Sequence, residues 1–293
     1  MLSASAIAYG AATIVNAIAT GKGAALGVDL WTKAKVELTD KPGIIEGRIL
    51  SDPGEDTNLI KRVIRRVLRR FRLEGEHGAF VETASNIPIA RGMKSSSAAA
   101  NAISLATIAA LKKKLSDLDV VKLGVEASKD AGVTITGAFD DACASYFGNI
   151  VVTDNVAQQV KRRFRVDGDY AVLFHVPSSK RYTAQSNVEK MKIMAPLVNV
   201  AYREALLGRY WSAMTFNGLI YSVALGYDIK AAVDALAAGA IAAGVSGKGP
   251  AIAAVACEDS VAEVKEAWNA FEGEVIQARA NRVKAHVVGT EDG

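Results

Sequence analysis

The sequence of 293 residues lacks most of the features that mark a secreted or membrane protein. Its two cysteines, Cys143 and Cys257, are too few for a disulfide framework, so a cytoplasmic protein is the default expectation. Residues 1–20 carry no charge, but a signal peptide begins with basic residues and the first one here is Lys22. No later stretch is long and apolar enough to cross a membrane as a helix. We therefore interpret residues 1–20 as a buried strand and turn.

Excess charge and low-complexity sequence are also missing. The formal net charge of +4 suits a protein that handles anions, but it is too small to indicate nucleic-acid binding on its own. The chain shows neither an internal repeat nor a low-complexity linker. Because 50% of its residues are hydrophobic, it can bury a large core in one large domain or two modest ones.

Hydrophobic periodicity predicts a mixture of strands and helices. Strands are expected at residues 23–39, 80–83, 150–152 and 170–176. Helices are expected at residues 97–113 and 118–131. The mixture predicts an α+β fold with a boundary near residues 150–165. We expect one domain over residues 1–155 and a second over residues 156–293.

The one basic cluster lies in a predicted amphipathic helix at residues 60–72. Its apolar residues recur at helical spacing on one face: Ile60, Val63, Ile64, Val67, Leu68 and Phe71. The arginines between them are most simply a solvated outer face. A nucleic-acid-binding protein is the alternative, and no basic motif interleaved with aromatic residues accompanies the cluster. We therefore expect neither a nucleic-acid nor a membrane partner.

The first segment that could form part of a functional site is IPIARGMKSSSA, residues 87–98. It reads as a strand end, a flexible turn at Gly92 and the start of a helix rich in small residues. The free N–H groups and the dipole at a helix start favour a phosphate, and a serine hydroxyl there can ligate magnesium. The alternative is a serine cap on an ordinary helix.

Two further segments carry polar or glycine-rich patterns. Residues 136–149, TGAFDDACASYFGN, place Asp140 and Asp141 in a stretch of small and apolar residues. Alone, the pair fits a helix N-terminus, where the helix dipole favours acids. Residues 244–251, GVSGKGPA, form a glycine cluster that alone fits a simple turn between a helix and a strand.

In their residues, order and spacing, these three segments resemble the motifs of the GHMP kinases, a superfamily of small-molecule kinases. The agreement of all three argues against coincidence. The resemblance implies a two-domain fold, with an N-terminal domain like ribosomal protein S5 and a C-terminal ferredoxin-like domain. It implies ATP and Mg²⁺ as cofactors and phosphoryl transfer to a hydroxyl. Carried over by position, the nucleotide-binding residues are Pro88, Arg91, Gly92, Met93, Lys94, Ser95, Ser96, Ser97, Ala98, Gly247 and Gly249. A Walker-type phosphate loop is absent from the sequence, which disfavours a P-loop kinase.

The resemblance also implies a catalytic aspartate seven residues before a glycine, and counting back from Gly148 gives Asp141. Ser96 would bind magnesium, together with Glu126 if an insertion separates Glu126 from Asp141; the alternative is that Glu126 is an exposed residue of a helix. Mevalonate-kinase-like members pair the aspartate with an N-terminal lysine. Here the matching position is near Tyr9, so Asp141 is expected to act without a lysine partner.

Within the superfamily, the segments resemble the archaeal-type shikimate kinases over nearly the whole chain, including residues 13–23, TIVNAIATGKG. This implies phosphorylation of the 3-hydroxyl of shikimate in chorismate and aromatic amino-acid biosynthesis. Homoserine kinase is the runner-up, although it typically carries Asn at the position of Asp141. A catalytically dead sensor is disfavoured because Ser96 and Asp141 are present. The expected substrate-binding residues are Asn16, Thr136, Gly137, Asp140 and Arg181, with Lys180 or Lys94 as alternatives to Arg181 as the carboxylate anchor.

Overall fold

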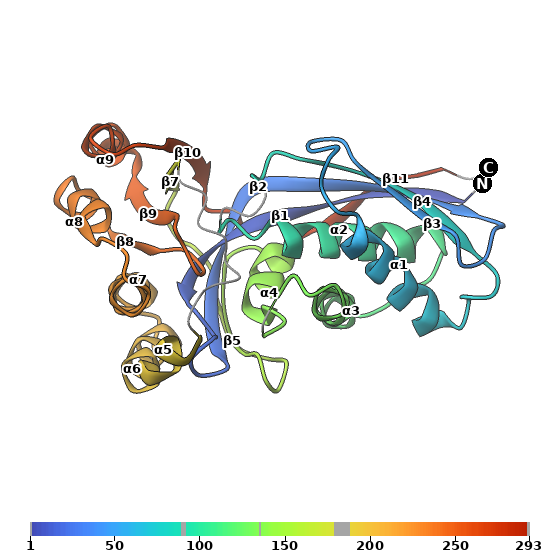
Figure 1. Cartoon of the computed structure of the whole chain (residues 1–293), viewed down its shortest axis with the longest axis horizontal. Helices are drawn as coiled ribbons and strands as arrows, with labels where there is room; N and C mark the ends of the chain where they lie inside the picture. The colour runs from blue at the N-terminus through green and yellow to red at the C-terminus, as the bar shows by residue number, and fades with distance from the viewer. Residues whose placement is uncertain (1, 89–91, 135, 179–187, 292–293) are drawn as a thin grey trace.

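The computed structural model describes residues 2–88, 92–134, 136–178 and 188–291. Within them, two β-sheets are flanked by helices, which confirms the predicted α+β class (Figure 1). The sheet at one end of the molecule holds both ends of the described chain. The other sheet is built from the second half of the sequence alone.

The first sheet has seven strands among the described residues, in the order β11-β1-β2-β4-β3, with β5 paired to β2 and β6 to β5. Their bounds are β1 (Ser3–Val15), β2 (Lys22–Thr39), β3 (Ile45–Ile49), β4 (Gly78–Ser85), β5 (Ile150–Asp154), β6 (Gln159–Phe164) and β11 (His286–Glu291). All neighbours are antiparallel except β3 and β4. The long strand β2 binds β4 along one half and β5 along the other.

Burial along β2 shows what covers the sheet. Residues 23–28 are buried without interruption, because both faces of the sheet are covered there. From Asp29 onward, buried and partly exposed residues mostly alternate, as in a sheet with one solvated face. Four helices pack on the covered side: α1 (Asn58–Phe71), α2 (Ser95–Ala110), α3 (Asp117–Asp130) and α4 (Phe139–Phe147).

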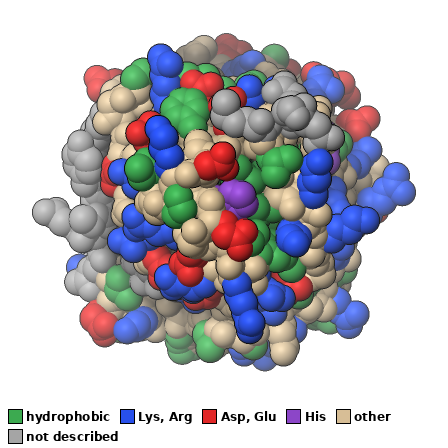
Figure 2. Space-filling view, turned by 90° about the vertical axis from the view of Figure 1, so that its right-hand side faces the viewer, with side chains coloured by type: hydrophobic (Ala, Val, Ile, Leu, Met, Phe, Trp, Pro, Cys, Tyr) green, Lys and Arg blue, Asp and Glu red, His purple; other side chains and the backbone are tan. Residues whose placement is uncertain are grey.

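The amphipathic helix predicted at residues 60–72 is α1. Ile60, Val63, Ile64, Val67 and Leu68 are buried, as the periodicity requires. Of the arginines on its outer side, Arg66 pairs with Asp130 and Arg69 with Glu74. On the face of the molecule in Figure 2, Lys and Arg side chains are intermingled with Asp and Glu.

The second sheet has the strand order β10-β7-β9-β8, all antiparallel. Its strands are β7 (Tyr170–Val176), β8 (Ala242–Val245), β9 (Ile252–Cys257) and β10 (Glu274–Arg279). Numbered within this sheet, the order is 4-1-3-2, with helices between the first and second strands and between the third and fourth. This is the ferredoxin-like arrangement that was expected. The helices are α5 (Val188–Ile193), α6 (Ala195–Leu206), α7 (Tyr210–Leu225), α8 (Lys230–Ala237) and α9 (Val261–Trp268).

The division expected at residue 155 does not follow the sheets. It falls between β5 and β6, which form one antiparallel pair, so the change of sheet comes between β6 and β7. The chain also returns at its far end, where β11 pairs with β1. None of the described helices is long and apolar enough to span a membrane.

Candidate active site

Two cavities meet where the two halves of the molecule face each other. The smaller has a volume of about 130 Å³ and is lined mainly by the end of β1, the segment before α4 and the start of α4. The larger, of about 350 Å³, lies between the start of α2 and the β3–α1 connection. Five residues line both cavities and define what we call the junction: Lys94, Ser96, Val133, Gly247 and Lys248.

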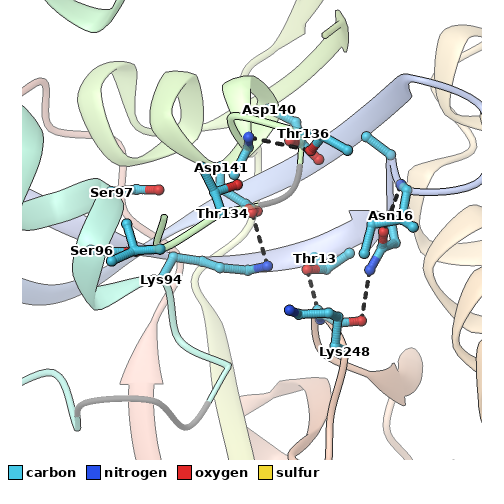
Figure 3. Close-up of a pocket in the computed structure, with 15 residues that line it drawn as sticks. Thr13, Asn16, Lys94, Ser96, Ser97, Thr134, Thr136, Asp140, Asp141 and Lys248 are labelled. Atoms are coloured by element: carbon cyan, nitrogen blue, oxygen red, sulfur yellow. Dashed lines mark hydrogen bonds and ion pairs between the residues drawn. The ribbon is translucent and has the colours of Figure 1, made fainter. Parts of the chain in front are cut away.

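The phosphate-binding segment predicted from the sequence forms one wall of the junction. Helix α2 begins at Ser95, two residues before the predicted start, and the preceding residue Lys94 adopts a left-handed conformation (φ 64°). As at any helix start, the first N–H groups of α2 lack partners within the helix, and they carry the positive end of the helix dipole. Ser95 and Ser96 line the larger cavity, and Ser96 and Ser97 line the smaller one (Figure 3). The local geometry therefore suits an anion that reaches from one cavity to the other.

Other members of this segment anchor it. The side chains of Met93 and Ala98 are fully buried in the core, and the Met93 carbonyl accepts a hydrogen bond from the Ala11 amide at 3.4 Å. Gly92 has φ 83°, and a β-carbon there would approach the Ser246 carbonyl oxygen to 3.0 Å. Pro88 is half-buried and lies outside the lining of both cavities as described. Arg91 falls outside the described residues.

Asp141 lies in the first turn of α4 and forms an ion pair with Lys94, with 2.9 Å between Oδ2 and Nζ (Figure 3). Both side chains are largely buried, at 8% and 15% exposure. The expectation that Asp141 acts without a lysine partner was therefore wrong. The partner comes from the phosphate segment rather than from β1. The other carboxylate oxygen, Oδ1, is buried and has no hydrogen-bond partner among the described residues.

Asp140 is held in a different environment. It is 3% exposed, and its Oδ1 accepts a hydrogen bond from Asn155 Nδ2 at 2.7 Å. Asn155 is in turn fixed by the Thr153 hydroxyl at 2.6 Å. Burial, reinforced by the charge of Asp141, raises the pKa of Asp140 to about 7. The two carboxyl groups are adjacent in the sequence but have different partners: Asp140 is bound to Asn155, and Asp141 to Lys94.

Gly23 on β2 makes room for Asp140. A β-carbon at this position would collide with the Asp140 carboxylate, reaching Cγ at 2.6 Å. The backbone of Gly23 does not need a left-handed conformation, so the requirement is for close approach alone.

The glycine-rich segment forms the third wall, in the loop after β8. The Gly247 amide donates to Thr13 Oγ1 at 2.9 Å, and its carbonyl accepts from Asn16 Nδ2 at 2.7 Å. The Ser246 hydroxyl donates to the Gly92 carbonyl at 3.0 Å, which ties this loop to the phosphate segment. Asn16 also accepts from the Ile18 amide, so its described contacts support the loop.

The structure does not bring every predicted residue to the cavities. Glu126 is 38% exposed, and its carboxylate binds Lys129 Nζ at 3.1 Å and Gln158 Nε2 at 2.8 Å. Glu126 is absent from the described lining of both cavities, so the structure does not bring this expected magnesium ligand to the junction. Thr136 does line the smaller cavity, whereas Gly137 serves the turn before α4 with φ 85°. Arg181 and Lys180 lie outside the described residues.

Sequence reasoning missed Thr13, Asn155 and Lys248. Thr13 and Lys248 lie inside quoted segments, from which only Asn16 and the glycines Gly247 and Gly249 were selected as site residues. Asn155 offered no signal, because its role depends on packing of the β5–β6 connection against α4. Lys248 lines both cavities, as Lys94 does.

Comparison with known proteins agrees with this geometry. The family model described as GHMP kinases N terminal domain matches residues 58–149, and that described as GHMP kinases C terminal matches residues 204–273. The chain therefore belongs to the GHMP kinases.

Within that family, two relatives of this chain are shikimate kinases. The chain is 48% identical to the shikimate kinase of Methanosarcina mazei, over 96% of this chain and 95% of that protein. It is 44% identical to the shikimate kinase of Pyrococcus abyssi, over 92% of this chain and 96% of that protein. The solved homoserine kinase from Cytophaga hutchinsonii superimposes with a TM-score of 0.76 at 19% identity, covering 98% and 97% of the two chains. That likeness shows a shared fold, which is the two-domain GHMP kinase fold.

Proposed function

We propose that this protein is a shikimate kinase, which transfers the γ-phosphate of ATP to the 3-hydroxyl of shikimate in chorismate and aromatic amino-acid biosynthesis. The close relatives of that name support the choice of acceptor. The observation that carries the chemistry is the buried Asp141, paired with Lys94 where two cavities meet. We place the enzyme in the cytoplasm, where its two free cysteines would remain reduced.

The relative size of the cavities suggests which substrate each one holds. The larger is the better match for a nucleotide, and the start of α2 lies at its junction with the smaller. The phosphates would then lie against the N–H groups of residues 95–97, with the terminal phosphate nearest the smaller cavity. The acceptor would occupy the smaller cavity, beside Asp141.

The reaction requires a proton acceptor and direct transfer of the phosphoryl group from ATP to the acceptor hydroxyl. The acceptor oxygen attacks the γ-phosphorus as the bond from that phosphorus to the bridging oxygen of ADP breaks, and ADP leaves with the electron pair. The hydroxyl proton passes to Asp141, whose Oδ1 lacks a partner among the described residues. Lys94 holds the other oxygen of Asp141 and thereby orients the carboxylate. Positioning by these groups supplies much of the acceleration.

Magnesium fits this site as an ion that arrives with the nucleotide. No group of three or more His, Cys, Asp or Glu residues is arranged to hold a metal within the part of the chain that the structure describes. The Ser96 hydroxyl lines the junction and is the protein oxygen we assign to the ion. One protein ligand is enough, because magnesium keeps several waters and commonly binds through substrate phosphates. When bound, the ion neutralises phosphate charge.

The test of this proposal is ATP turnover with shikimate, compared with homoserine, mevalonate and galactose at equal concentrations. Of these four acceptors, we expect only shikimate to support ADP formation. Asp141→Asn should lower kcat by about 100-fold or more while the fold is kept, because the proton acceptor is lost.

Asp140→Asn is the matched control, since it changes the neighbouring buried carboxyl in the same way. We expect a smaller loss of kcat, because Asp140 is bound to Asn155 rather than to Lys94. A larger loss in Asp140→Asn than in Asp141→Asn would show that the roles are reversed. Turnover with homoserine and not shikimate would overturn the choice of acceptor.

A further inference from the structure

The junction contains two cations, and their situations differ. Lys94 is neutralised by Asp141 at 2.9 Å. Lys248 is half-buried in the loop after β8, and no hydrogen bond or ion pair reaches its ammonium group among the residues that the structure describes. Figure 3 shows the two lysines coming from different walls, Lys94 from the start of α2 and Lys248 from the glycine-rich loop.

The backbone of Lys248 is held from several directions. Its carbonyl accepts a hydrogen bond from the Tyr227 hydroxyl at 2.8 Å. On one side, Gly247 is bound to Thr13 and Asn16; on the other, the Gly249 amide donates to the Ser246 carbonyl at 3.0 Å. The loop therefore fixes the base of the side chain, while the ammonium group donates to none of the described residues.

Such an arrangement is costly without an anion. Burial, and secondarily the positive charge of Lys94, lowers the pKa of Lys248. The junction holds two like charges, and among the described residues only Lys94 has a carboxylate partner, so an added anion would be strongly favoured there. The smaller cavity offers the carboxylates of Asp140 and Asp141, and these are bound to Asn155 and Lys94 respectively.

We propose that Lys248 is a catalytic residue that binds the phosphoryl group in transit between the two cavities. This rests on the proposed kinase function. A nucleotide in the larger cavity would place its terminal phosphate at the junction, and transfer carries that group into the smaller cavity. Because Lys248 lines both cavities, it borders the phosphoryl group before and after transfer. A cation there stabilises charge on the phosphoryl oxygens in the transition state.

The test compares Lys248→Met and Lys248→Arg with Lys114→Met, which removes an exposed lysine beyond α2. We expect Lys248→Met to lower kcat about 100-fold with the KM for shikimate within about threefold of wild type. Lys248→Arg should recover part of kcat because it keeps the positive charge. Lys114→Met should match wild type, and circular dichroism of each variant confirms that it folds.

A binding measurement tests the same residue without an acceptor. ADP lacks the group that Lys248 is proposed to hold, whereas the β,γ-imido analogue of ATP carries it. Lys248→Met should weaken binding of the analogue by about tenfold and leave ADP binding unchanged. Equal weakening of both, or of neither, would overturn the proposal.

The outcomes separate the two proposals. A raised KM for shikimate with kcat retained would make Lys248 the anchor of the acceptor carboxylate and would refute a role at the phosphoryl group. If wild-type protein turned over no shikimate, the proposed acceptor would fail. The comparison of ADP with the analogue would still decide what Lys248 binds.

Discussion

At the scale of single residues, Asp140 should affect stability as well as the chemistry beside it. Its pKa is raised by burial to about 7, above the value of about 3.9 for a free aspartate. Between these two values the folded protein keeps a proton on Asp140 that the unfolded chain has lost, so the contribution of Asp140 to the free energy of unfolding falls as pH rises from about 4 to about 7. One such group contributes a slope of at most about 1.4 kcal/mol per pH unit.

Asp140→Asn removes this titration and leaves a side chain of the same shape beside Asn155. We expect urea unfolding, measured at several pH values from 4 to 8, to show that the free energy of unfolding of wild type, relative to that of the variant, decreases as pH rises. Lys114→Met is the control, because its side chain is exposed and Lys114 is not among the described residues that line the two cavities. Parallel curves for wild type and Asp140→Asn would contradict the assignment.

At the scale of elements, helix α7 contacts strand β8 backbone to backbone. A β-carbon on Gly218 would collide with the Cα of Gly244, and one on Gly244 would reach the Cα of Gly218 at 2.6 Å. The adjacent Asn217 accepts a hydrogen bond from the Asn16 amide at 3.0 Å, so the position of α7 is passed on to the loop at Gly247.

Gly218→Ala should force these elements apart and lower stability by about 1–3 kcal/mol, as overpacking does. Kinase activity should fall as well, through the displaced Asn217. Ser212→Ala introduces the same side chain on an exposed position of α7 and should leave both unchanged. Chemical unfolding and turnover together test this. If Gly218→Ala kept wild-type stability and activity, the contact between α7 and β8 would be shown to accommodate the added methyl group.

The sequence predicts an element well when the contacts that form it join residues that are close along the chain. Local periodicity fixes α1, and glycine and serine content marks the loops at Gly92 and Gly247, so these were predicted. Counting back from Gly148 also selected Asp141, which lines the smaller cavity; its catalytic role stays a prediction. The ion pair between Lys94 and Asp141 joins residues 47 apart, and the pairing of β11 with β1 spans nearly the whole chain. Neither leaves a local pattern, because each exists only once α2 and α4, or the two ends of the sheet, have come together.

At the scale of the whole molecule, β11 covers the outer edge of β1. Its Val287 and Val288 are 39% and 44% exposed, so its contribution is mainly backbone pairing rather than buried apolar surface. A chain that ends at Ala285 leaves that edge bare. We expect it to lose about 2–4 kcal/mol of stability and to aggregate more readily.

Val288→Thr keeps the strand and its pairing, so it should resemble wild type in both respects. Unfolding in urea and light scattering during storage measure the two effects. A shortened chain as stable and as monodisperse as Val288→Thr would show that β11 adds nothing to the sheet.

The division of the junction between two stretches of chain also suits the protein to complementation assays. A break in the connection between β6 and β7, where Asp167 and Asp169 are exposed, would leave Lys94 and Asp141 on one fragment and Lys248 on the other. The second fragment would still supply β11 to the sheet of the first. Phosphoryl transfer would then appear only after reassembly, so two proteins fused to the fragments could report their own encounter through it.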